Sequence, residues 1–297
     1  MIPALEKLEA RGYELHCVGK GWASSLLEGH GWKVTPYPKA FSARVETLKQ
    51  LRHSVAPRIT NSKAINAITF ATSFSSAMDM RFAGLRAYGY AVEARSFLLA
   101  RSAPIVYGEH AMHSYWRLAS ALLGDAAPPP RAVALKVSDR AKREAALALA
   151  DANVSSSYIV AVPFAGGTFE KLDKRWPHFA TWVAQCAPGL GRDIVLAPGP
   201  DEIEMAKANF PAAKLLPNLS LGAYAALMQN AAVTVSNDTG PGHMAASVGG
   251  KLLSVLGPTK REQWGALGEH VSVVQSYPEW PSVERVGAEV NRLLAGT

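Results

Sequence analysis

Short apolar runs alternate with amphipathic segments along the whole chain, and the changes of pattern fall at glycines, prolines or small polar residues. Short runs rich in β-branched residues predict strands, and apolar residues spaced three to four apart predict helices. We expect strands at 13–18, 32–35, 88–90, 158–163, 193–197, 231–236 and 252–256. We expect helices at 23–30, 78–84, 112–123 and 140–150, and one more that opens at Met244. This alternation predicts an α/β fold with parallel sheets.

A proline run marks the division of the chain into two parts. Pro128-Pro129-Pro130 forms a stiff, extended break, and we place the domain boundary between Ala127 and Ser157. At 297 residues, either part is long enough to bury a core of its own. The sequence therefore predicts two doubly wound, Rossmann-like domains, at residues 1–140 and 151–297.

The stretch 236–246 reads S-N-D-T-G-P-G-H-M-A-A and lies between two predicted strands. In a doubly wound sheet, ligands bind at the carboxyl ends of strands, where the next helix offers free N–H groups to an anion. Gly240 and Gly242 let the backbone approach a ligand, Thr239 offers a hydroxyl and His243 a ring nitrogen. Taken singly, Asp238 and Thr239 are ordinary helix caps, and a lone His243 is more often structural. Their order and spacing favour a phosphate or diphosphate site.

This stretch resembles the signature of glycosyltransferase family 9, the bacterial heptosyltransferases of lipopolysaccharide core assembly. That signature is Asp-Thr/Ser-Gly-x-x-His followed by small residues, a strand and Gly-Pro-Thr. Its first part is similar to Asp238–His243 of this chain, and its Gly-Pro-Thr to Gly257-Pro258-Thr259. Lys174-Arg175-Trp176-Pro177 and Pro200-Asp201-Glu202 are similar to two further family elements. Weaker similarities to the family occur at residues 73–77 and 108–110. The resemblance extends over nearly the whole chain and is stronger in its second half.

The resemblance implies a GT-B fold, with the acceptor-side domain and the donor-binding domain facing a central cleft. It also implies an inverting, metal-independent transfer of heptose from ADP-heptose to a lipopolysaccharide core acceptor, without a cofactor. The implied donor-binding residues are Thr168, Lys174, Glu202, Asp238, Thr239, Gly240 and His243. Lys174 and the backbone N–H groups of Thr239 and Gly240 would stabilise the leaving diphosphate. Thr168 would add a hydroxyl to the phosphates, and Glu202 would accept hydrogen bonds from the ribose.

The acceptor side and the catalytic base are less clearly marked. The acceptor-side candidates are Ser75, Arg95 and His110, and a structural role is favoured for each of them. In the family, the proposed base is an Asp shortly before a Pro-x-Leu that Pro3-Ala4-Leu5 resembles, so this Asp would precede Met1 and the catalytic residue is unknown. Asp79 is the nearest acid, but its helical position argues against it. We expect the chain to lack the first strand of its first sheet and to be a poor catalyst.

Charge is distributed unevenly within a net charge of +7. Residues 1–150 contain 20 Lys and Arg against 11 Asp and Glu, and residues 151–297 contain 11 against 13. Most of these cations are expected to be solvated, but the asymmetry favours a phosphorylated glycolipid acceptor at the anionic inner-membrane surface. Nucleic acid is disfavoured because no nucleic-acid module accompanies the charge.

The remaining features favour a cytoplasmic protein with peripheral contact at the inner membrane. No apolar run approaches the ~20 residues that span a bilayer, and the first residues lack a signal-peptide pattern. Cys17 and Cys186 lie in different halves and are expected to be reduced thiols. No spacing of His, Cys or Asp suggests a metal site.

Several alternatives stay open. The chain could be a non-catalytic sugar-nucleotide-binding paralogue, or an N-terminally truncated inactive form. A glycosyltransferase of the same fold that acts outside lipopolysaccharide assembly is hardly separated by the sequence. A nicotinamide-dependent oxidoreductase ranks lower, because no G-x-G-x-x-G follows any predicted strand. The transferred sugar, the acceptor hydroxyl and the oligomeric state are not determined by the sequence.

Overall fold

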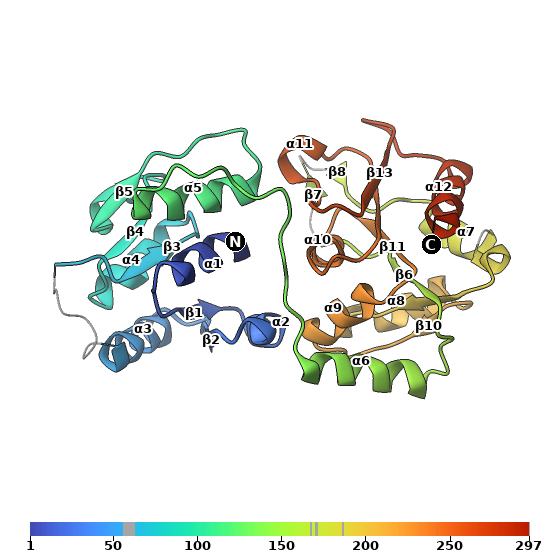
Figure 1. Ribbon diagram of the computed structural model, residues 1–297, viewed down its shortest axis with the longest axis horizontal. Helices are drawn as coiled ribbons and strands as arrows, with labels where there is room; N and C mark the ends of the chain where they lie inside the picture. Colours follow the sequence, from blue (N-terminus) through green and yellow to red (C-terminus); the bar gives the residue numbers. More distant parts are fainter. Residues whose placement is uncertain (56–62, 167, 170–171, 186, 297) are drawn as a thin grey trace. The chain divides into compact units, whose positions relative to one another are not determined.

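The computed structural model describes residues 1–55, 63–166, 168–169, 172–185 and 187–296 (Figure 1). The chain divides into two compact units. Unit 1 comprises Met1–Ser24 and Trp32–Pro130, and unit 2 comprises Ser25–Gly31 and Arg131–Thr297. Both units are α/β, and their main sheets are parallel. Among the described residues, no helix has the length and apolar character needed to cross a membrane.

Unit 2 is built on one six-stranded parallel sheet with the order β10-β9-β6-β11-β12-β13. The strands are β6 (Tyr158–Val162), β9 (Asp193–Leu196), β10 (Lys214–Leu215), β11 (Val233–Asn237), β12 (Leu252–Leu256) and β13 (Val271–Gln275). Within this sheet, the chain first passes from β6 through β9 to β10 at one edge. It then passes from β11, beside β6, through β12 to β13 at the other edge. The switch point of this doubly wound order lies between β6 and β11, where such folds bind ligands.

Helices cover both faces of this sheet. The helices of unit 2 after the division at Arg131 are α6 (Asp139–Asp151), α7 (Phe179–Gln185), α8 (Ile203–Asn209), α9 (Leu221–Gln229), α10 (Gly240–Ser247), α11 (Arg261–Trp264) and α12 (Val283–Ala295). On one face, alternate strand residues such as Ile159 and Val235 pack with Trp182 of α7 and Val286 of α12. On the other face lies α10, which packs against β11 and α9. All five residues of β6, β11 and β12 are buried, as expected for strands covered on two sides.

Unit 1 contains two parallel sheets within its described residues. One pairs β1 (His16–Gly19) with β2 (Lys33–Pro36), and the other has the order β3 (Ala67–Thr69), β4 (Ala87–Tyr90), β5 (Arg101–Ala103). The helices are α1 (Ile2–Ala10), α3 (Phe41–Val55), α4 (Phe74–Phe82) and α5 (Ala111–Leu123), with α2 (Ala23–Leu27) at the division between the units. Helix α1 packs against α5, where the Nζ atom of the buried Lys7 donates to Ser120 Oγ at 2.8 Å and pairs with Asp125 at 3.0 Å.

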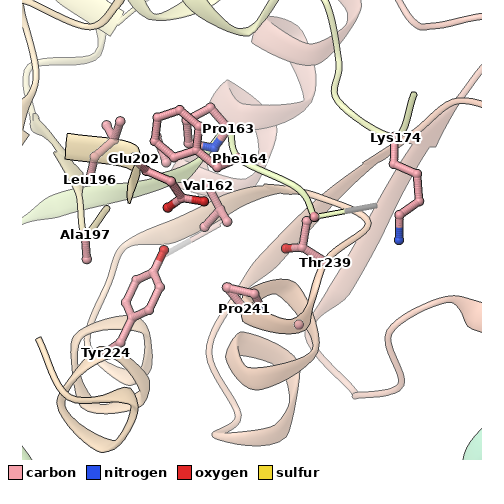
Figure 2. A pocket seen from close by; sticks show the side chains of 13 residues that line it. Val162, Pro163, Phe164, Lys174, Leu196, Ala197, Glu202, Tyr224, Thr239 and Pro241 are labelled. Carbon is pink, nitrogen blue, oxygen red and sulfur yellow. The ribbon is translucent and has the colours of Figure 1, made fainter. Parts of the chain in front are cut away.

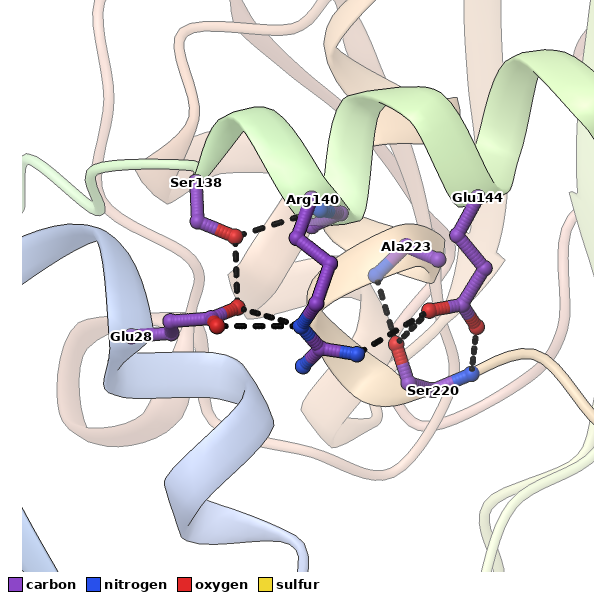
Figure 3. Close-up of polar contacts among 7 residues, drawn as sticks. Glu28, Ser138, Arg140, Glu144, Ser220 and Ala223 are labelled. Carbon is purple, nitrogen blue, oxygen red and sulfur yellow. Dashed lines mark hydrogen bonds and ion pairs between the residues drawn. The ribbon is translucent and has the colours of Figure 1, made fainter.

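The short segment around Glu28 follows α2 early in the sequence but packs within unit 2 (Figure 3). Its carboxylate accepts a hydrogen bond from Ser138 Oγ at 2.6 Å and pairs with Arg140 Nε at 2.9 Å, at the start of α6. One turn later, Glu144 accepts hydrogen bonds from the backbone N and the Oγ of Ser220, which caps α9. These contacts join three segments that are far apart in the sequence.

The strands and helices predicted from the hydrophobic pattern are confirmed, with shifts of a few residues at their ends. The largest shifts concern α4, which begins at Phe74 and not at Met78, and α10, which begins at Gly240 and not at Met244. Pro241 explains the earlier start of α10, because a proline in the first turn needs no N–H partner and has a helical φ. The hydrophobic pattern left several elements unpredicted, including α3, α7, α8, β10 and β13. Helices α9 and α12 were also unpredicted, although each begins after a serine N-cap, at Ser220 and Ser282.

Candidate functional site

A pocket of about 210 Å³ lies at the switch point of the unit 2 sheet (Figure 2). The segment 161–164 at the end of β6 and Leu196 and Ala197 at the end of β9 form much of its apolar wall. The segment 239–241, after β11, forms another part of the wall. Lys174, Glu202 and Tyr224 bring polar groups to this wall from three other places in the sequence.

The start of α10 presents backbone donors to this pocket. Thr239 is the N-cap residue, with φ −144° and ψ 166°, and its side chain makes no capping hydrogen bond. The first hydrogen bond of the helix runs from His243 N to Thr239 O at 3.2 Å, and Pro241 has no N–H. The N–H of Gly240 therefore precedes the helical hydrogen bonds, at the positive end of the helix dipole. A phosphate is the kind of group that such a helix start binds.

The two glycines of this turn have different roles. A Cβ built on Gly240 meets no atom within 4 Å, so this residue faces open space in the pocket. A Cβ on Gly242 would lie 2.8 Å from Ser236 Oγ, so Gly242 lets α10 pack closely against β11. The open approach to a ligand that the sequence suggested for both glycines therefore holds only for Gly240, and Gly242 has a packing role instead.

Lys174, Asp238 and His243 come together beside the pocket. Lys174 Nζ lies 3.8 Å from Asp238 Oδ2, and His243 Nε2 lies 3.6 Å from Asp238 Oδ1. Burial would raise the pKa of Asp238, but hydrogen bonding from His243, the charge of Lys174 and the hydroxyl of Thr259 together hold it below its usual value. The charged carboxylate thus steadies the Lys174 ammonium group, which lines the pocket.

Glu202 is held in place by the turn in which it lies. It ends a short 3-10 helix (Pro200–Glu202), and its Oε2 atom accepts a hydrogen bond from the backbone N of Gly199 at 2.9 Å. Figure 2 shows Glu202 and Lys174 on opposite sides of the pocket. The pocket therefore has a cationic side and a side with a fixed carboxylate, whose Oε1 atom makes no hydrogen bond with the described residues.

Asn237 connects segments of the site, although no role was predicted for it from the sequence. Its side chain is 1% exposed, its Oδ1 atom accepts from Trp176 N at 3.0 Å, and its Nδ2 atom donates to Pro163 O at 2.6 Å. Asn237 therefore ties the loop that carries Lys174 to the ends of β11 and β6. An amide at the last position of a buried strand, beside the motif, was the signal available in the sequence.

The predicted donor residues fall into three groups. Lys174, Glu202, Thr239 and Gly240 line the pocket. Asp238 and His243 lie outside the pocket lining. Asp238 contacts both Lys174 and His243. Thr168 begins the two-residue strand β7 (Thr168–Phe169), which pairs with β8 (Leu172–Asp173), but its side chain lies outside the described part of the structure. Cys186 also lies outside the described residues.

Trp176, within the Lys174–Pro177 element, is 2% exposed in the core of unit 2, and its Nε1 atom donates to Pro281 O at 2.9 Å. Trp176 therefore packs in the core and is not part of the pocket wall.

The acceptor-side candidates have structural contacts in unit 1. Arg95 is fully buried, and its Nη1 atom donates to the carbonyl oxygens of Ala71 and Ser73 at 2.6 and 3.1 Å. Ser73 is the N-cap of α4, and its Oγ atom accepts a hydrogen bond from Ser75 Oγ at 3.3 Å, so Arg95 and Ser75 share one turn. His110 caps α5 instead. Burial lowers the pKa of Arg95.

Asp79 is unsuited to be a catalytic base in this structure. It is 1% exposed and ion-paired with Arg44, whose Nε lies 2.7 Å away, and it accepts a hydrogen bond from the Tyr37 hydroxyl at 2.5 Å. Burial and the Asp79 carboxylate raise the pKa of Tyr37. Elsewhere in the described residues, no group of three His, Cys, Asp or Glu side chains is arranged to hold a metal ion.

The chain is similar in sequence and in fold to known proteins. The family model described as glycosyltransferase family 9 (heptosyltransferase) matches residues 52–293. Lipopolysaccharide heptosyltransferase 1 of Pseudomonas aeruginosa is 32% identical over 193 residues, which is 62% of this chain and 50% of that protein. The match thus spans about half the length of this curated relative.

Solved structures share the fold over almost the whole chain. For E. coli ADP-heptose LPS heptosyltransferase II, the TM-score is 0.77 at 21% identity, over 99% of this chain and 94% of that one. For E. coli heptosyltransferase WaaC with ADP, it is 0.73 at 23% identity, over 98% and 94%. For a family 9 glycosyltransferase from Veillonella parvula, it is 0.81 at 16% identity, over 100% and 93%. The chain therefore has the GT-B fold and belongs to glycosyltransferase family 9, the heptosyltransferase family.

Proposed function

We propose that this chain binds ADP-heptose in the pocket between β6 and β11 and transfers the heptose to a lipopolysaccharide core acceptor, with inversion and without a metal. The observation that carries the proposal is the polarity of the pocket. Lys174 and the start of α10 suit an anionic diphosphate, and the fixed Glu202 carboxylate suits the neutral, hydroxyl-bearing ribose. The solved structures of the relative WaaC with ADP and with ADP-2-deoxy-2-fluoro heptose support this choice of donor.

The pocket would act on the leaving group. As the acceptor hydroxyl attacks the anomeric carbon and loses its proton to a base, the diphosphate gains negative charge. Lys174 and the N–H of Gly240 would stabilise that charge where it develops. We assign no residue of this chain as the base, since Asp79 is buried and engaged by Arg44.

Titration calorimetry of the chain with ADP-heptose, ADP and NADH tests the proposal. We expect saturable binding of ADP and ADP-heptose, both tighter than binding of NADH. A folded sample that binds neither ADP nor ADP-heptose, or that prefers NADH, would contradict the donor assignment. Binding of ADP-heptose without transfer to any core acceptor would instead favour the non-catalytic sugar-nucleotide-binding alternative.

We assign the acceptor and a peripheral contact with the inner-membrane surface to unit 1. Unit 1 contains 15 Lys and Arg against 8 Asp and Glu, whereas unit 2 contains 16 of each. Unit 1 also exposes aromatic rings at both ends of α4, where Phe74 packs with Phe97 at 6.2 Å and Phe82 with Phe41 at 5.8 Å. Phe97 is 72% and Phe82 61% exposed. Positive charge and exposed apolar rings together favour contact with anionic lipid.

We expect the double variant Phe82→Ser/Phe97→Ser to bind phosphatidylglycerol vesicles at least about tenfold more weakly than the wild type, because two rings no longer enter the lipid. Co-sedimentation with vesicles at low salt measures this, and ADP affinity should be unchanged. Leu147→Ser, at an exposed position of α6 in unit 2, is the control and should sediment as the wild type does. Equal sedimentation of the double variant and the wild type would rule out this surface.

A further inference from the structure

Tyr224 of α9 presents a hydroxyl to the donor pocket, although the sequence indicated no role for it. The side chain is 8% exposed, and the residue belongs to the pocket wall. Figure 2 shows the phenol rising from α9 with its oxygen directed toward the side of the pocket where Glu202 lies. Within the described part of the chain, no group hydrogen-bonds this hydroxyl. A nine-tenths buried polar group thus faces the pocket without a protein partner.

Two other buried tyrosines have their hydroxyls paired, whereas the hydroxyl of Tyr88, 3% exposed in unit 1, has no hydrogen bond within the described residues. Tyr158, in β6 of the same unit, donates to Leu227 O at 2.9 Å. Tyr90, in unit 1, donates to Ser114 O at 2.5 Å. Leaving a buried hydroxyl unpaired costs free energy. Because Tyr224 lines the pocket and its oxygen faces it, a group that enters the pocket can supply the missing partner.

The neighbourhood of Tyr224 defines the chemistry of that group. Burial, and next the charge of Glu202, raise the pKa of Tyr224, so the phenol keeps its proton at neutral pH and donates a hydrogen bond. Glu202 has its Oε1 atom left to accept one, because Gly199 engages Oε2. A ligand hydroxyl satisfies both groups, since it accepts from one and donates to the other. A phosphate offers no donor and is repelled by the carboxylate, and an ammonium group offers no acceptor.

We propose that Tyr224 and Glu202 together bind one ribose hydroxyl of the nucleotide, and that Tyr224 thereby selects ribonucleotides over the matching deoxynucleotide. This inference rests on the proposed function, because it takes the ligand of the pocket to be a nucleoside diphosphate. A site built to hydrogen-bond a hydroxyl rejects the analogue that lacks it more strongly than an apolar wall would.

The test measures affinities of ADP, 2′-deoxy-ADP and 3′-deoxy-ADP by calorimetry for the wild type and for Tyr224→Phe. We expect the wild type to bind one of the two analogues about tenfold more weakly than ADP. Tyr224→Phe should lower ADP affinity about three- to tenfold, which is the effect of losing one hydrogen bond. For the analogue that the wild type binds more weakly, the same substitution should change the affinity less than about twofold, because the hydroxyl that Tyr224 would bind is already absent. Tyr158→Phe is the matched control, because it removes a buried hydroxyl outside the pocket and should leave all three affinities unchanged.

Each contrary outcome identifies what has failed. If Tyr224→Phe binds ADP as the wild type does, or loses affinity equally for all three nucleotides, the role of Tyr224 is overturned while the donor site stands. If the folded wild type binds none of the three, the proposed function fails and the inference falls with it. Lys174→Ala separates the two sides of the pocket, since it should weaken the three nucleotides equally.

Discussion

Replacing Lys174 with alanine is expected to weaken ADP binding by about 10- to 100-fold, the effect of losing a charge-assisted hydrogen bond of about 1.5–3 kcal/mol. The ammonium group lines the pocket and is steadied at 3.8 Å from Asp238, so it is placed before the ligand arrives. The loss should be largest at low salt, because the ligand is anionic. Titration calorimetry with ADP measures it.

The neighbouring Arg175 provides the matched control for Lys174. Its guanidinium pairs with Asp173 at 2.7 Å, is about half exposed, and is not part of the pocket wall. Arg175→Ala removes the same charge one residue away and should leave ADP affinity within about twofold of the wild type, as expected for an exposed ion pair. If Lys174→Ala binds ADP as the wild type does, Lys174 does not contact the phosphates.

Replacing Asn237 with alanine is expected to reduce the free energy of unfolding by about 2–5 kcal/mol, because a buried N–H and a buried carbonyl each lose their partner. These groups are Trp176 N and Pro163 O, at 3.0 and 2.6 Å from the amide. For a unit of this size, the melting temperature should fall by roughly 5–15 °C. ADP affinity should also fall, because the loop that holds Lys174 loses its anchor.

Thermal unfolding followed by circular dichroism, together with ADP titration, measures both effects of Asn237→Ala. Asn230→Ala is the control, since the Nδ2 atom of Asn230 donates to Ala226 O at 3.2 Å at the exposed end of α9. Asn230→Ala should lower the melting temperature only slightly and leave ADP affinity unchanged. A melting temperature for Asn237→Ala equal to that of the wild type would show that the two buried groups find other partners.

The two substitutions separate binding from folding. Lys174 is partly exposed and contributes charge to the pocket, so its loss should affect ADP much more than stability. Asn237 lies beneath the same loop and contributes no group to the pocket wall, so its loss should affect both. A result in which Lys174→Ala is the less stable variant would reverse the roles given to these residues.

The sequence by itself determined the parallel α/β architecture and the turn that begins α10. Both depend on local properties. The alternation of β-branched runs with amphipathic segments predicts strands and helices, and the residues from Asp238 to Gly240 are contiguous, so the turn places them together whatever the rest of the chain does.

Only the tertiary structure decided which distant groups share the pocket. Lys174, Glu202 and Tyr224 lie in three separate loops and helices, and the strand order around β6 brings them together. It also showed that Asp238 holds Lys174 and His243 beside the pocket, that Asn237 anchors the loop, and that the Glu28 segment packs with unit 2. The local sequence pattern predicts whether a residue lies in a strand, a helix or a turn. Contacts between residues far apart in the sequence depend on strand order and register, which a short stretch of sequence does not specify.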